Sequence, residues 1–168
     1  MVTKNWYMAI KSNMIRKVIP GGLTTWDGSH AHSGYSTSGT NVMESVAFYM
    51  TKAVFASGTE GIVLGSGTTP ATVYDYALES LITSGLNANV VRSADGGDNL
   101  VYVLTLTNTS VEEITIGEIG IVDQAYTGEG SGYKQVLMER TVLDSPVTLS
   151  AGDVAVVTYT ISLGIPQA

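Results

Sequence analysis

Short runs that are rich in β-branched residues dominate the last third of the chain. They span residues 100–107, 114–122, 134–140 and 154–163, and Asn, Asp, Gly, Ser or Pro bounds each of them. Val, Ile, Thr and Tyr fit the pleated surface of a strand, whereas the bounding residues favour turns. Together with a further apolar run at 61–67, the pattern predicts a mainly β fold, an antiparallel β-sandwich of the Ig-like or jelly-roll type.

A hairpin is predicted between residues 89–93 and 100–107. The intervening Asp95-Gly-Gly-Asp-Asn99 supplies the residue types that hairpin turns require. The same segment resembles part of a calcium loop, but Val and Tyr follow where the glutamate of such a loop would stand. We therefore expect a hairpin turn here rather than a calcium site.

In the run at 114–122, the apolar residues move from one face of the predicted strand to the other. Ile114 and Ile116 share one face of an extended strand, whereas Ile119 and Ile121 share the other. Because side chains alternate strictly along a regular strand, one extra residue must be inserted between the two pairs. Gly117 lies there, so we predict a β-bulge at this glycine.

The final run, residues 154–163, has the longest alternation in the chain. One parity is apolar and is predicted to face the core. It consists of Ala155, Val157, Tyr159, Ile161 and Leu163. The other parity becomes polar toward its end and is predicted to face water or a neighbouring chain. It consists of Val154, Val156, Thr158, Thr160 and Ser162.

Glu118 and Arg140 interrupt two otherwise apolar strands. A charge inside a sheet is tolerated when it is paired, or when it faces solvent or a partner chain. We expect the strands to bring Glu118 and Arg140 together as a structural ion pair. The alternative is that both side chains point into water.

The beginning of the chain has a different pattern. The apolar spacing over residues 5–19 predicts a short amphipathic helix, which Pro20-Gly21-Gly22 would end. Residues 21–41, including the small polar run GSHAHSGYSTSGT, are predicted to be irregular. Residues 42–55 fit a strand or a helix. The fold is therefore expected to begin with a helical or irregular attachment segment.

This attachment segment comprises residues 1–57 and precedes a sandwich domain that comprises residues 58–168. Four of the eight basic residues lie in the first 17 positions, although the chain has a net charge of −7. A locally basic segment favours contact with a partner surface, and the alternative is a solvated helix face. The candidate partner-binding residues are Lys4, Trp6, Tyr7, Ile10, Lys11, Met14, Arg16 and Lys17.

Charge and hydropathy argue against several classes of partner. A net charge of −7 and a pI near 4.6 argue against direct nucleic-acid binding, which needs a basic surface. No apolar run approaches the length of about 18 residues that a membrane helix needs. The first residues lack the continuous apolar region of a signal peptide, so we expect synthesis in a cytoplasm.

Residues that could carry catalysis or bind a metal do not form a recognisable pattern. His30 and His32 could chelate a metal, but no cysteine or further histidine completes a zinc site. Symmetry copies around an oligomer axis would be needed to complete it. Glu112 and Glu113 are adjacent, so on a strand they point to opposite faces and cannot flank one glycosidic bond. We expect no enzymatic activity, no cofactor and no metal.

Residues 61–163 resemble a broad group of tailed-bacteriophage virion proteins. The resemblance rests on an ordered set of motifs: GIVLGSGTTPATVYDYALESLI, LVYVLTLTNTS, ITIGEIGIV and LMERTVLDSPVTLSAGDVAVVTYTI. The N-terminal NWYMAIKSNM also looks like the start of such proteins. The resemblance implies a non-enzymatic structural or accessory role on a phage particle, as a capsid decoration, a head-fibre base or a tail part. It carries over no catalytic residue.

The function expected from this resemblance is that of a capsid decoration or auxiliary head protein that docks on a symmetric protein lattice. Its partners would be major capsid or tail proteins, and its location the virion. The sparse charge and high Gly and Thr content lead us to expect self-association, as a trimer. The alternative is a glycan-binding or adhesion module of a tail or head fibre, which would use exposed aromatic rings to stack on sugars.

Overall fold

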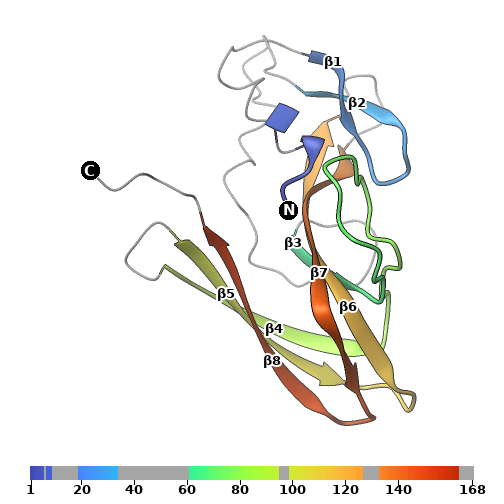
Figure 1. The fold of residues 1–168 in the computed structure, drawn as a ribbon, viewed down its shortest axis with the longest axis vertical. Coiled ribbons are helices and arrows are strands. Elements are labelled where there is room, and N and C mark those ends of the chain that lie inside the picture. Colours follow the sequence, from blue (N-terminus) through green and yellow to red (C-terminus); the bar gives the residue numbers. More distant parts are fainter. Residues whose placement is uncertain (6, 9–18, 34–60, 95–98, 127–132, 163–168) are drawn as a thin grey trace.

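The computed structural model describes residues 1–5, 7–8, 19–33, 61–94, 99–126 and 133–162, and these residues form a mainly β structure (Figure 1). Their strands are β1 (Ile19–Thr24), β2 (His30–Ser33), β3 (Gly61–Gly65), β4 (Leu86–Ala94), β5 (Asn99–Asn108), β6 (Ile114–Tyr126), β7 (Tyr133–Leu149) and β8 (Val154–Ser162). The backbone is helical at Lys4, Asn5, Tyr7 and Met8.

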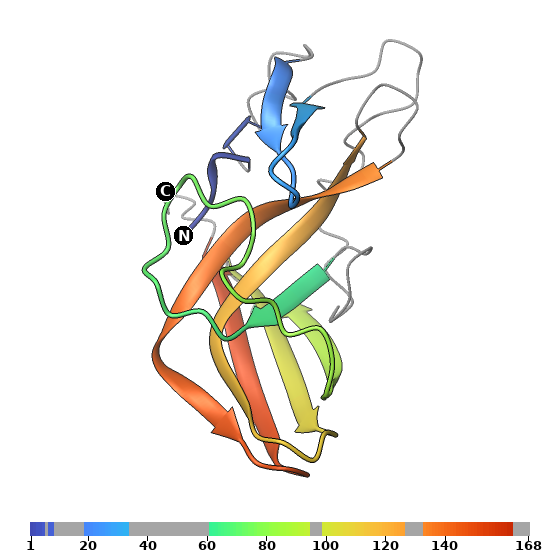
Figure 2. The same ribbon diagram turned by 90° about the vertical axis from the view of Figure 1, so that its right-hand side faces the viewer.

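The strands form two three-stranded antiparallel sheets and a separate hairpin. One sheet has the order β3-β6-β7 and the other the order β4-β5-β8, while β1 pairs with β2. The chain leaves the second sheet after β5, enters the first as β6 and β7, and returns through a turn at residues 150–153 to β8. The β1–β2 hairpin lies beside the end of β6 and the start of β7, where the N–H of Trp26 donates to the carbonyl of Gln135 (Figures 1 and 2).

Both sheets contribute to one hydrophobic core. Side chains of β3, β6 and β7 pack in the same buried cluster as side chains of β4, β5 and β8, and Leu23 of β1 joins them. The buried members are Leu23, Ile62, Leu64, Leu86, Tyr102, Leu104, Leu106, Ile116, Ile119, Ile121, Val136, Met138, Leu149 and Tyr159. Burial of this apolar surface is the main favourable term that holds the two sheets together.

The predicted hairpin and the predicted parity of the last strand are confirmed. β4 and β5 pair in register from Leu86↔Asn108 to Ala94↔Leu100. Along β8, Tyr159 is buried and Ala155 and Val157 pack against the core, whereas the side chains on the other parity from 154 to 160 are exposed. Leu163 lies outside the described residues, and only the backbone of Ile161 is described.

The predicted change of facing at Gly117 is confirmed, but the extra residues of the register shift lie on β7, at 143–146, rather than at Gly117. The pairing of β6 with β7 shifts between Ile116 and Glu118, which returns Ile119 and Ile121 to the buried side. A Cβ atom at Gly117 would lie 2.5 Å from the carbonyl oxygen of Gly67. The absence of a side chain here thus allows the segment after β3 to pass directly over β6.

The prediction that residues 21–41 are irregular is wrong for the described part of that range, because β1 and β2 form a hairpin there. The backbone N–H of Thr25 donates to the carbonyl of Ser29 at 2.9 Å, and the N–H of Ser29 donates to Asp27 Oδ1 at 3.0 Å. Gly28 has a φ of +79°, which favours glycine. Local turn chemistry and the burial of Leu23 therefore form a hairpin without an alternating apolar pattern.

Two other element boundaries differ from those expected from the sequence. The predicted helix over 5–19 is not shown, because residues 9–18 lie outside the described residues and Ile19 belongs to a strand. The strand predicted over residues 134–140 is longer, because β7 continues through Pro146 to Leu149. Pro146 is tolerated because β7 is an edge strand of its sheet, and the β6–β7 pairing is interrupted between Val142 and Val147. Residues 42–55 lie outside the described residues.

Candidate functional site

A buried ion pair lies at the centre of the most elaborate polar site among the described residues. Glu118 of β6 has no solvent exposure, and Arg140 of β7 is 3% exposed. Arg140 Nε donates to Glu118 Oε2 at 2.7 Å. The two strands therefore bring the two charges together inside the protein rather than into water.

Glu118 also binds the backbone of a long connection between β3 and β4. We call residues 66–80 the braced loop. Glu118 Oε1 accepts hydrogen bonds from the N–H groups of Gly67, at 3.2 Å, and Ser80, at 2.9 Å. Glu118 Oε2 accepts one from the N–H of Glu79 at 3.2 Å. One buried carboxylate thus holds both ends of the loop.

Glycines make room for this carboxylate. A Cβ atom at Gly65 would collide with Glu118 Oε1 and would lie 2.7 Å from the carbonyl oxygen of Ser80. A Cβ atom at Gly67 would lie 2.6 Å from Glu118 Oε1. The glycines at the end of β3 and just after it are therefore explained by the close approach of the backbone to Glu118.

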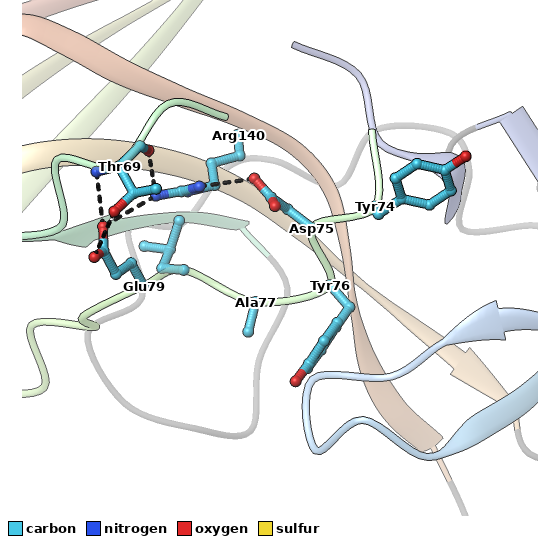
Figure 3. Close-up of a pocket in the computed structure, with 8 residues that line it drawn as sticks. Thr69, Tyr74, Asp75, Tyr76, Ala77, Glu79 and Arg140 are labelled. Carbon is cyan, nitrogen blue, oxygen red and sulfur yellow. Dashed lines mark hydrogen bonds and ion pairs between the residues drawn. The ribbon is translucent and has the colours of Figure 1, made fainter. Parts of the chain in front are cut away.

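Arg140 holds the middle of the braced loop. Its Nη1 donates to Asp75 Oδ2 at 2.7 Å, its Nη2 donates to the carbonyl of Thr69 at 3.1 Å, and Nη2 lies 3.6 Å from Glu79 Oε2. The planar guanidinium can make these contacts at once because its donors point in fixed directions. Figure 3 shows Arg140 between the Thr69–Glu79 side and the Asp75 side of the site.

The loop's own carboxylates complete its conformation. Glu79 accepts from the N–H groups of Thr68 and Thr69, at 3.0 and 2.9 Å, and from the hydroxyl of Thr69 at 2.8 Å. Asp75 accepts from the N–H and the hydroxyl of Thr72, at 2.9 and 2.8 Å. These carboxylates replace backbone partners that a loop lacks.

The contacts shift the pKa values of the charged groups. Burial alone would raise the pKa of Asp75, but the Thr72 N–H and Arg140 outweigh it and hold that pKa below its ordinary value. Hydrogen bonds from Thr69 lower the pKa of Glu79. Burial would lower the pKa of Arg140, but Asp75 and Glu118 outweigh it, so the net shift is upward. The charged form of all three groups is therefore favoured in the folded protein.

An open pocket of about 310 Å³ lies over this network. It is lined by Thr69, Tyr74, Asp75, Tyr76, Ala77, Leu78, Glu79 and Arg140. Tyr74 is 75% exposed and Tyr76 is 45% exposed. Figure 3 shows that the two rings point in different directions, with Tyr76 directed toward the β1–β2 hairpin. The pocket thus displays aromatic side chains without forming one flat aromatic platform.

The N-terminal turn lies directly beside the braced loop (Figures 1 and 2). The N–H of Lys4 donates to the carbonyl of Val73 at 2.7 Å. Asn5 fixes the turn, because its Nδ2 donates to the carbonyls of Thr24 and Leu137, at 2.7 and 3.1 Å, and its Oδ1 accepts from the N–H of Thr24 at 2.8 Å. The start of the chain is thereby attached to β1 and β7.

The structure describes two of the predicted partner-binding residues. Lys4 is exposed and Tyr7 is 63% exposed. The others lie outside the described residues, and these are Trp6, Ile10, Lys11, Met14, Arg16 and Lys17. His30 and His32 lie on β2, and their side chains are not described.

Sequence reasoning missed Thr69, Asp75 and Glu79 as members of the site. Glycines before the loop and two acidic residues within it were the only available signal. Among the residues that the structure describes, no three His, Asp or Glu side chains gather as a metal ligand set.

Comparison with family models, curated proteins and solved structures finds no match for this chain. The helical residues that the structure describes include no segment long and apolar enough to span a membrane.

Proposed function

We propose that this chain is a non-enzymatic structural protein of a tailed-phage particle, a capsid decoration or auxiliary head protein that docks on a protein lattice. The observation that carries the proposal is the braced loop, in which a buried ion pair holds an exposed tyrosine in a fixed position. The sequence resemblance supports the choice of a phage particle as the setting.

A rigid loop with an exposed aromatic residue is suited to protein docking. Tyrosine is enriched at the energetically important positions of protein interfaces. Ordering a mobile loop on binding costs affinity, and a loop that is ordered beforehand avoids this cost. The bonds from Glu118 and Arg140 fix residues 66–80 in this way, while Tyr74 stays 75% exposed.

The docking surface would include the start of the chain. We define the aromatic corner as Lys4, Tyr7, Val73 and Tyr74. Lys4 is hydrogen-bonded to Val73, and Tyr7 follows Lys4 by three residues in the same turn, so both lie on one face of that turn. The corner joins an apolar and aromatic surface to one positive charge, which fits an acidic, partly apolar patch on a partner.

The hydrogen bonds that Glu118 and Arg140 make within the protein support a structural rather than a catalytic role. Glu118 is bonded to three backbone N–H groups and to Arg140. Arg140 is in turn bonded to Asp75 and Thr69. Groups that are used in this way stabilise a loop conformation, and loss of the charge on Glu118 or Arg140 would weaken it.

We further propose that the two sheets form a β-sandwich. The shared core between β3-β6-β7 and β4-β5-β8 supports this arrangement. The strand order of the whole chain would decide between Ig-like and jelly-roll connections.

The proposal is tested on purified particles of the phage that encodes the chain. Mass spectrometry should find the chain in the particles at a fixed ratio to the major capsid protein. Particles that lack the chain should rebind the purified wild-type protein, whereas Tyr74→Ala should bind at least tenfold more weakly. Val111→Ala, at an 88% exposed position outside the corner, is the matched control. Absence of the chain from particles, or equal binding by Tyr74→Ala, would refute the proposal.

A glycan-binding module is the second candidate. Exposed Tyr74 and Tyr76 at one pocket favour it, because sugars stack on tyrosine rings. The divergent rings in Figure 3 disfavour it, because a sugar chain stacks best on coplanar rings. Binding of the purified chain to a glycan array, lost in Tyr76→Ala, would favour this candidate over the first.

A further inference from the structure

The exposed Tyr74 lies between two residues of the braced loop that other parts of the chain hold in place. On one side, the carbonyl of Val73 accepts a hydrogen bond from the N–H of Lys4 at 2.7 Å. On the other side, Asp75 accepts one from Arg140 Nη1 at 2.7 Å. The ring of Tyr74 is largely exposed, so its own burial does little to fix it. Its position therefore depends on the contacts of its two neighbours.

The N–H group that holds Val73 belongs to a segment bound along β7. We call residues 1–5 the strap. The N–H of Thr3 donates to the carbonyl of Met138 at 3.0 Å, and the N–H of Arg140 donates to the carbonyl of Met1 at 3.1 Å. These hydrogen bonds pair the strap with an edge strand of its sheet, so β7 positions the strap.

The strap directs alternate side chains toward the protein and toward solvent. Thr3 and Asn5 are buried, and the hydroxyl of Thr3 donates to the carbonyl of Leu137 at 2.7 Å. Val2 and Lys4 are exposed. The inward side chains attach the strap to β7, and the backbone N–H of Lys4 is thereby held beside the braced loop.

Arg140 belongs to both sets of contacts. Its backbone N–H bonds to the strap, and its guanidinium bonds to Asp75 and to the carbonyl of Thr69. The strap, the braced loop and Arg140 therefore form a closed ring of hydrogen bonds. In such a ring, the loss of one contact removes a restraint on the others.

We propose that the strap is a positioning element that controls how Tyr74 is presented. With the strap on β7, the loop is held on both sides of Tyr74. With the strap released, Arg140 alone would hold the middle of the loop, and a partner would have to order Tyr74 on binding, which costs affinity. The effect on binding rests on the proposed docking function, whereas the coupling between strap and loop is a property of the isolated chain.

A proline at position 4 tests the contact between strap and loop directly. Lys4→Pro removes the N–H that bonds to Val73, and proline suits the first position of a helical turn, where Lys4 lies. Lys4→Ala removes the same side chain but keeps the N–H, so it is the matched control. Chymotrypsin should cleave Lys4→Pro after Tyr74 and Tyr76 about three to ten times faster than Lys4→Ala, as expected for the loss of one hydrogen bond.

The coupling should also act from the loop to the strap, because coupling between two sites is reciprocal. Asp75→Asn removes the charge that Arg140 contacts. It should speed hydrogen exchange at the Thr3 amide at least about twofold. Asp144→Asn, which changes the net charge equally at an exposed position of β7, should leave that exchange rate at the wild-type value.

Thr3→Val provides a second test if Lys4→Pro does not keep the wild-type circular dichroism. It keeps the shape of a buried side chain and removes the hydroxyl that bonds to β7, so it should also be cleaved faster than the wild type in the loop. Equal cleavage of Lys4→Pro and Lys4→Ala, or an unchanged Thr3 exchange rate in Asp75→Asn, would overturn the proposal. All these measurements use the isolated chain, so their failure is distinguishable from a failure of the chain to bind particles.

Discussion

At the residue scale, Gly117 shows how a missing side chain allows two segments to cross. A Cβ atom there would lie 2.5 Å from the carbonyl oxygen of Gly67, which is backbone and cannot rotate away. We expect Gly117→Ala to lower the free energy of unfolding by about 2 kcal/mol or more. Chemical denaturation measures this loss.

Gly152→Ala is the matched control for this experiment. Gly152 has a φ of +83°, but a Cβ atom there would have no other atom within 4 Å, so its substitution tests backbone strain alone. We expect a loss of about 1 kcal/mol. If Gly152→Ala proved the more damaging change, the close approach at Gly117 would not be the reason for its glycine.

Asp75 gives the site a defined dependence on pH. Its pKa is lowered in the folded protein, so the unfolded chain binds a proton at a higher pH than the folded chain does. The stability that Asp75 contributes is therefore present above about pH 4 and is lost as the pH falls through its folded pKa. Asp75→Asn should show a shallower loss of stability between about pH 5 and pH 3.

Urea unfolding at a series of pH values measures this slope for Asp75→Asn and the wild-type protein. Asp144→Asn removes a carboxylate from an exposed position of β7 and controls for the change in net charge. Identical slopes for Asp75→Asn and the wild type would show that the lowered pKa of Asp75 does not contribute to acid sensitivity.

At the element scale, the braced loop should depend on Glu118. Glu118→Gln removes the negative charge that opposes buried Arg140 and offers an N–H₂ group where Glu118 now accepts hydrogen bonds. Breaking a buried pair in this way typically costs about 3–5 kcal/mol. We expect the loop to open more often, which limited proteolysis by chymotrypsin detects as faster cleavage after Tyr74 and Tyr76.

Glu113→Gln is the control for the proteolysis experiment, because Glu113 is exposed and distant in sequence from the loop. It should be cleaved at the wild-type rate. Cleavage of Glu118→Gln at that same rate would mean that other contacts are sufficient to hold residues 66–80.

The sequence predicts the elements whose side chains alternate. The pattern from Ile114 to Ile121 predicted the strand and its change of facing, and the pattern from Val154 to Thr160 predicted the parity of β8, because a half-buried strand must alternate. The pattern did not predict that the extra residues of the shift lie on β7. The β1–β2 hairpin was missed, since its turn depends on hydrogen bonds around Asp27 and its described core contribution is Leu23.

The candidate site could be predicted only in part, because some of its residues lie in a loop that has no alternating pattern. Glu118 and Arg140 were expected to meet because a charge in an apolar strand needs a partner. Asp75 and Thr69 have no periodic pattern, and they contact Arg140 from 65 and 71 residues away in the chain. Such contacts follow from the path of the loop, which local sequence does not specify.

At the scale of the whole molecule, Asn5 joins three parts of the fold. Its side chain bonds to β1 at Thr24 and to β7 at Leu137, while the residue before it bonds to the braced loop. Asn5→Ala would leave the N–H of Thr24 without this buried acceptor, so we expect a loss of about 1–3 kcal/mol. Hydrogen exchange at the Thr24 amide should become faster.

Lys4→Ala is the control for Asn5→Ala, because the Lys4 contact with the loop is made by its backbone. It should leave both the stability and the Thr24 exchange rate close to the wild-type values. An unchanged exchange rate in Asn5→Ala would show that the N-terminal turn does not hold β1 in place.

The long sequence separation of the bonds to Arg140 has a consequence for the order of folding. Residues 66–80 leave the ribosome well before Arg140 does, and bonds that close long loops form after local hairpins. During synthesis, residues 66–80 therefore lack their hydrogen bonds to Arg140 until β6 and β7 have paired. Tyr74 and Tyr76 lie in this loop, so they reach the positions described here only after β6 and β7 have paired.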